Sequence, residues 1–107
     1  MKRYIFIESR DPFESRDTQF VEDTAVAIKE RGHEVTVFLV QNGVLAARKS
    51  VRRLGRLAEA GVILLADDFS LRERGIKSDE LAPGIRESGI DALVDALVQE
   101  NTKALWH

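Results

Sequence analysis

Two short segments of this sequence are apolar almost throughout: Glu34–Val40 (EVTVFLV) and Val62–Ala66 (VILLA). A strand with one face in water alternates apolar and polar residues, so runs without alternation are typical of strands buried on both faces. Strands of this kind belong to parallel sheets that helices cover on both sides. Two further apolar runs, Arg3–Ile7 (RYIFI) and Thr102–Trp106 (TKALW), predict two more strands.

Helical segments separate the predicted strands. Their apolar residues recur at the three- and four-residue spacing that places them on one helix face. They cover Val21–Ile28, Val51–Ala58, a short turn at Phe69–Arg74, and Ile90–Val98. Strands that alternate with helices need crossover connections, which are right-handed. We therefore predict an α/β fold, a three-layer sandwich with a mainly parallel sheet of the flavodoxin-like kind, in which residues 1–107 form a single domain.

Composition narrows the range of partners. Hydrophobic residues make up 44% of the 107 residues and charged residues 32%, with 16 Lys and Arg against 18 Asp and Glu. Because phosphate binding favours a net basic surface, we expect no nucleic acid partner. No apolar run reaches the roughly 18 residues of a membrane span, and Tyr4–Ile7 is too short for a signal peptide. We expect no membrane association and a cytoplasmic location.

The sequence contains no cysteine. This excludes disulfides, thiolate metal sites, cysteine nucleophiles and persulfide chemistry within these residues. No motif for a cofactor or a metal ion is present, and we expect neither.

Polar residues follow the second and third predicted strands, where ligands bind in open α/β sheets. Structural roles compete with ligand binding, since Asn-Gly favours a tight turn with positive φ and a carboxylate favours a helix N-terminus. The candidate ligand-binding residues are Gln41, Asn42, Gly43, Asp67, Asp68, Ser70 and Arg74.

Five basic residues gather around the predicted second helix. Since the whole chain is net negative, we interpret this basic cluster mainly as a solvated face or a subunit contact, although it also suits an anionic ligand or an acidic partner. Its members are Arg48, Lys49, Arg52, Arg53 and Arg56.

Two alternative functions remain open. One uses the same edge of the sheet, and the other uses no binding site. Glu8, Asp67 and Asp68 at neighbouring strand ends suggest a metal-dependent enzyme in which carboxylates hold Mg²⁺. A plain assembly protein without a ligand is the other alternative. A hydrolytic role for Ser70 is not favoured, because it has no local base and His107, the last residue, is expected to be mobile.

Several segments taken in order resemble the DsrE/DsrF/DsrH-like family of sulfur-relay proteins. They are VFLVQNGV (Val37–Val44), GVILLADDFSLRERGI (Gly61–Ile76), SGIDALVDALV (Ser88–Val98) and the final TKALWH. The resemblance implies a small α/β sandwich that assembles into homo- or hetero-oligomers, with trimers and hexamers typical. It also implies, in active members, a cysteine that carries sulfur as a persulfide and precedes a Leu-x-x-Arg-Gly segment after the third strand.

In this sequence that segment is Leu71–Gly75, and Ser70 occupies the position of the cysteine. A hydroxyl is not ionised at neutral pH and cannot hold a persulfide, so no catalytic residue is expected. We predict a non-catalytic, homo-oligomeric DsrE-like protein that binds a partner protein or a small ligand between Gln41–Gly43, Asp67–Ser70 and Arg74. We further expect Arg74 to pair with one of the two aspartates.

Overall fold

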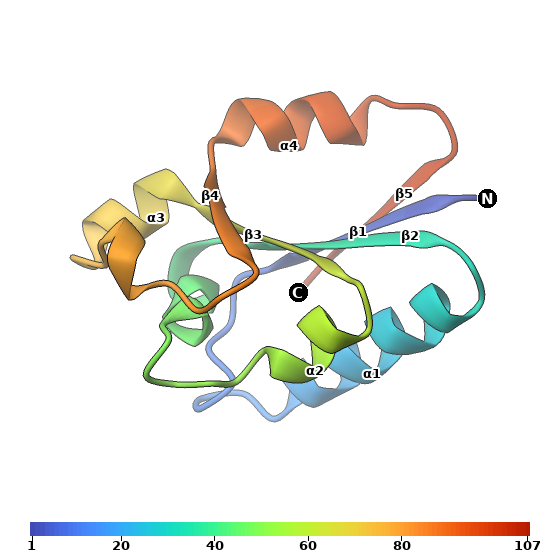
Figure 1. Cartoon of the computed structure of the whole chain (residues 1–107). Helices are drawn as coiled ribbons and strands as arrows, with labels where there is room; N and C mark the ends of the chain where they lie inside the picture. The colour runs from blue at the N-terminus through green and yellow to red at the C-terminus, as the bar shows by residue number, and fades with distance from the viewer.

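A five-stranded sheet forms the centre of the computed structural model, which describes residues 1–107 (Figure 1). All its strands are parallel, in the order β4-β3-β2-β1-β5. The strands are β1 (Arg3–Glu8), β2 (Glu34–Leu39), β3 (Ile63–Asp67), β4 (Ile85–Ser88) and β5 (Thr102–Trp106). The helices are α1 (Asp17–Glu30), α2 (Gly55–Glu59), α3 (Asp68–Glu73) and α4 (Ile90–Leu97), with 3₁₀ helices η1 (Gln41–Ala47) and η2 (Ser78–Glu80).

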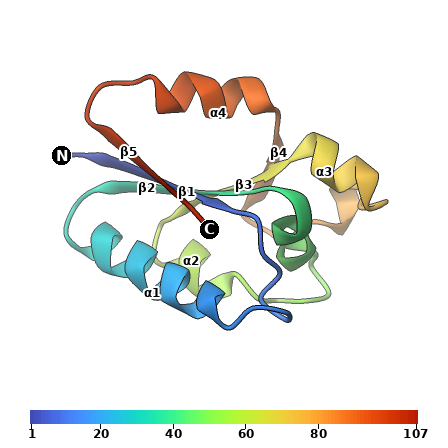
Figure 2. The same cartoon turned by 180° about the vertical axis from the view of Figure 1, so that it is seen from behind.

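Helices cover the sheet on both faces, so the predicted three-layer α/β sandwich is confirmed. The chain runs from β1 to β4 in one direction across the sheet, and right-handed crossovers place α1 and α2 on one face. The return from β4 to β5 runs in the opposite direction, which places α4 on the other face (Figures 1 and 2). None of these helices combines the length and apolar character needed to cross a membrane.

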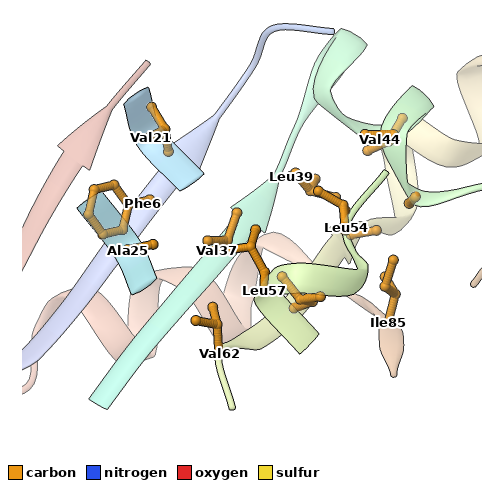
Figure 3. Close-up of a cluster of buried hydrophobic side chains, with 14 of the residues drawn as sticks. Phe6, Val21, Ala25, Val37, Leu39, Val44, Leu54, Leu57, Val62 and Ile85 are labelled. Atoms are coloured by element: carbon orange, nitrogen blue, oxygen red, sulfur yellow. The ribbon is translucent and has the colours of Figure 1, made fainter. Parts of the chain in front are cut away.

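The main core lies between the sheet and the layer of α1 and α2. Ala25 of α1 lies near Phe6 of β1, and Leu57 of α2 lies near Val37 of β2 (Figure 3). On the opposite face, Leu93 of α4 closes a smaller core. The middle strand β2 supplies buried side chains to both cores, which explains why its sequence is apolar almost without alternation.

Two segments differ from the sequence prediction. β4 was not predicted, because as an edge strand it buries only Ile85, and the exposed Arg86 and Glu87 hide the strand pattern. The helix expected over Val51–Ala58 is shorter than predicted, since only the α2 residues at its end are helical.

Gly43 has a different structural role from the predicted tight turn. The positive φ at this junction belongs to Gln41, at 50°, and Gly43 lies inside η1. A Cβ atom on Gly43 would lie 2.2 Å from the carbonyl oxygen of Glu8. Gly43 is therefore required because the backbones at the ends of β1 and β2 approach too closely for any side chain.

The variant Gly43→Ala is expected to lower the free energy of unfolding by about 2 kcal/mol or more, because backbone atoms must move to admit the methyl group. Chemical denaturation measures the change. Gly55→Ala is the matched control, since a Cβ atom there meets nothing within 4 Å, and its stability should equal or slightly exceed that of the wild type. Equal stabilities of the two variants would contradict this interpretation of Gly43.

One carboxylate is buried on the inner face of α1. Glu22 is 5% exposed, and its Oε2 lies 3.1 Å from Nη2 of Arg53 without the alignment of a hydrogen bond. Burial raises the pKa of Glu22, and the nearby charges of Arg53 and Arg56 offset part of this effect. The folded state therefore holds the Glu22 proton to higher pH than the unfolded state does, and this contribution to stability is lost as pH rises through the folded-state pKa.

The stability of Glu22→Gln relative to the wild type is expected to rise between about pH 4 and pH 7, because only the wild type must ionise a buried carboxyl. Urea unfolding at several pH values measures the difference. Asp23→Asn is the control: its hydrogen bond to Arg56 lowers the pKa of Asp23 from 3.8, so Asp23 is ionised across most of this range. The stability difference between that variant and the wild type should stay nearly flat, and the same pH slope in both variants would refute the role of burial.

Candidate functional site

An open pocket of about 460 Å³ lies where β2, β3 and β5 end, and we call it the strand-end pocket. Five of the seven candidate residues line it: Gln41, Asn42, Asp67, Ser70 and Arg74. They come from three places in the chain, namely the start of η1, the end of β3 and the α3 helix with its cap. Parallel strands bring these places together because their carboxyl ends meet at one edge of the sheet.

Ser70 is held by hydrogen bonds on both sides of its hydroxyl. Its Oγ donates to Oδ2 of Asp67 at 2.6 Å and accepts the backbone N–H of Gln41 at 2.8 Å. The same Asp67 oxygen accepts the backbone N–H of Ser70 at 3.0 Å, so Asp67 caps α3, which is the structural alternative to ligand binding at this position. Ser70 is only 4% exposed. Its hydroxyl therefore fixes the end of β2 to the start of α3.

Arg74 binds across the pocket. Its Nε and Nη2 donate to Oδ1 of Asn42 at 3.2 and 3.0 Å, and its Nη1 donates to the carbonyl of Ser70 at 3.2 Å. The expected pairing of Arg74 with Asp67 or Asp68 is wrong. Asp67 is occupied by Ser70, and Asp68 lies 3.8 Å from Arg72, one helical turn along α3.

Gly43 and Asp68, the other two candidates, do not line the pocket. Gly43 is buried against the backbone of Glu8. Asp68 is the first residue of α3, where a negative charge suits the helix dipole, and its carboxylate faces Arg72 and the Gly89 backbone. Gly43 and Asp68 therefore have structural roles, and neither contributes to the pocket.

Apolar side chains that we did not predict as site residues form the rim of the pocket. Phe69, Ile90 and Trp106 line it and are 60%, 57% and 67% exposed. Exposed apolar side chains gathered at one place mark an interaction surface, whereas singly scattered ones do not. The sequence could have indicated Trp106 as a site residue, because a tryptophan at the carboxyl end of a predicted strand lies at the ligand-binding edge. The sequence could also have indicated Phe69, since it lies between the candidates Asp68 and Ser70.

The end of β5 is fixed to the end of β1. Nδ1 of His107 lies 2.9 and 2.8 Å from the two carboxylate oxygens of Glu8, and its backbone N–H donates to the Ile7 carbonyl at 2.8 Å. The expectation that His107 is mobile is therefore wrong. The backbone bonds of His107 to Ile7 and Ser9 extend the pairing of β5 with β1 beyond Trp106.

The acidic residues at the strand ends are not gathered into one site. Glu8 contacts His107, Asp67 accepts from Ser70, and Asp68 faces Arg72. No group of three or more His, Asp or Glu side chains is arranged to hold a metal ion. The geometry therefore gives no support to the metal-dependent enzyme.

The strand-end pocket combines three kinds of noncovalent contact. Arg74 supplies positive charge, the exposed Gln41 and Asn42 supply amide groups, and the aromatic rim supplies apolar surface. Six of the ten lining residues are polar or charged, Glu73 among them, so the pocket offers a mainly polar surface with an aromatic rim. The one nucleophilic side chain, the Ser70 hydroxyl, is buried and has no histidine among its hydrogen-bond partners.

Comparisons with known proteins agree with this fold. The structure is similar to that of MTH1491 from Methanobacterium thermoautotrophicum, a protein of unknown function, at 20% identity with a TM-score of 0.83, over 100% of both chains. It is also similar to the ychN protein from E. coli, at 17% identity with a TM-score of 0.84, over 98% of this chain and 100% of that one. A comparison with curated proteins finds no match. The DsrE/DsrF-like family model matches residues 2–103, and the chain therefore belongs to the DsrE/DsrF-like family.

Proposed function

We propose that this protein is a non-catalytic member of its family, which recognises a partner protein or a small ligand in the strand-end pocket and acts as a homo-oligomer, a trimer or a hexamer. It does not carry sulfur. The observation that supports this proposal most directly is the state of Ser70, which stands where active relatives are expected to have their cysteine.

The Ser70 hydroxyl serves the structure and not covalent chemistry. Persulfide transfer needs an ionised, accessible thiol, whereas Ser70 is 4% exposed and both donates and accepts a hydrogen bond. The neighbouring carboxylate of Asp67 disfavours a second negative charge at this point. The loop therefore keeps its shape without a carrier atom.

Recognition without covalent chemistry agrees with the contents of the pocket. Its rim exposes Phe69 and Trp106, and Arg74 holds Asn42 beside them. Aromatic side chains and arginine are enriched where proteins bind partners tightly. The cytoplasmic location expected from the sequence belongs to this proposal too, and cell fractionation would check it.

An unpartnered apolar face on α4 supports assembly with further copies of the chain. Ile90, Val94 and Leu97 recur at the spacing of one helix face, yet they are 57%, 49% and 37% exposed, while Leu93 on the same helix is buried. The apolar arc of α4 is thus wider than the surface that the sheet covers. Ile90 joins this arc to the rim of the strand-end pocket.

The free edge of the sheet supports assembly as well. β5 is an edge strand, and Asn101 and His107 bond to β1 through their backbones. Because alternate residues bond to the same neighbour, the N–H and C=O groups of Thr102, Ala104 and Trp106 face away from β1. An open edge beside exposed apolar side chains is a surface that a second copy can cover.

Sulfur uptake tests the non-catalytic part of the proposal. After incubation with a polysulfide donor, the intact mass of the wild type and of Ser70→Ala should be unchanged. Ser70→Cys should gain sulfur, though more slowly than free cysteine, because its thiol is buried beside a carboxylate. A wild-type protein that accepts sulfur and passes it onward would refute the proposal.

Light scattering coupled to size-exclusion chromatography tests assembly. The wild type should elute as an oligomer, and the double variant Val94→Lys/Leu97→Lys should fall to the monomer mass, because two charges cannot be buried in an apolar contact. Ala92→Lys, an exposed position on the opposite side of α4, is the matched control and should keep the wild-type mass. A monomeric wild type would contradict the assembly.

A further inference from the structure

A second pocket, of about 470 Å³, lies beside α2 on a part of the surface that shares no residue with the strand-end pocket. We call it the α2 pocket. Leu64 of β3, Ile85 of β4 and Leu54 before α2 contribute apolar side chains to it. Its volume falls within the roughly 300–1,000 Å³ of small-molecule sites.

The only charged side chains that line the α2 pocket are Lys49 and Arg52. No carboxylate lines the pocket, and neither cation forms an ion pair in the structure. A cavity with apolar walls and two unpaired cations is complementary to an anion that has an apolar body.

The fold separates these two cations from the rest of the basic cluster. Arg53 pairs with Glu22, and Arg56 pairs with Asp23, so both are neutralised by acids of α1. Arg48 donates from its Nε to the carbonyl of Leu45 at 2.9 Å. Lys49 and Arg52 alone combine an absence of ionic partners with a position at the pocket. Both side chains are exposed, as the interpretation of the cluster as a solvated face expects, and both lie at the α2 pocket.

The backbone of Arg52 has an uncommon conformation. Its φ is +53°, in the left-handed region that residues other than glycine and asparagine seldom adopt. Nothing in the hydrogen bonding of the Arg52 side chain explains this conformation, because none is present. The conformation follows directly on a turn that the backbone N–H of Val51 closes with the Arg48 carbonyl at 3.0 Å.

We propose that the α2 pocket binds a small organic anion, in which an aromatic or branched aliphatic body carries a phosphate or carboxylate group. The body lies against Leu54, Leu64 and Ile85, and the anionic group lies between Lys49 and Arg52. The guanidinium of Arg52 matches the geometry of two oxygens at once, while Lys49 acts as a point charge. This site is independent of the function proposed for the strand-end pocket.

Phenyl phosphate is the probe, and backbone amide shifts in ¹H–¹⁵N NMR spectra locate its binding. Saturable shifts are expected at Gly55, Ala58 and Ala82, which line the pocket. Benzyl alcohol lacks the charge and inorganic phosphate lacks the apolar body, so each should bind at least about tenfold more weakly.

Two variants test the cations separately. Lys49→Gln and Arg52→Asn should each weaken phenyl phosphate binding by about tenfold. Arg52→Asn should not lower the melting temperature, because asparagine tolerates a positive φ, so its loss of binding cannot be attributed to misfolding. Arg72→Gln, which removes an exposed arginine outside the pocket, is the matched control and should bind as the wild type does.

Four results would overturn the proposal. One is a set of shifts that maps around Trp106 instead of the α2 pocket. Another is benzyl alcohol binding as tightly as phenyl phosphate, or full affinity in both cation variants. The last is a change in the chemical shifts of the same amides with protein concentration alone, which would mean that a second copy covers the pocket.

Discussion

The hydroxyl of Ser70 holds the ends of β2 and β3 together. It donates to Asp67 and accepts from the backbone of Gln41, and so it joins two strand ends that lie far apart in the sequence. Gln41 has a positive φ, and its backbone N–H is satisfied by the buried hydroxyl of Ser70. Arg74 completes the arrangement by bonding to both sides of the same junction. The shape of the strand-end pocket depends on this small network.

The same network shows how the loop at Ser70 keeps its shape without a cysteine. A hydroxyl forms the hydrogen bonds of a loop anchor better than a thiol does, but it is not ionised at neutral pH. The exposed surface beside it is apolar, through Phe69, Trp106 and the open arc of α4. These features agree with the recognition and assembly that we propose for this edge of the sheet.

Sequence patterns predicted most of the fold because strands buried on both faces consist almost entirely of apolar residues. β2 supplies both cores, and its apolar run could be recognised without a structure. β4 left no such signal, because an edge strand buries one side chain and exposes the charges beside it. The segment after β2 was expected to be a tight turn, whereas the close approach to the Glu8 backbone, and not a positive φ, makes Gly43 necessary.

The sequence by itself determined the parallel α/β architecture, the absence of a thiol and five of the residues that line the strand-end pocket. These properties follow from local composition and from the rule that parallel strands end at one edge. Only the tertiary structure decided which groups meet: Arg74 with Asn42 and not an aspartate, and Arg53 and Arg56 with acids of α1, which leaves Lys49 and Arg52 unpaired. Contacts between segments remote in sequence depend on the docking of whole elements, and no local pattern encodes that docking.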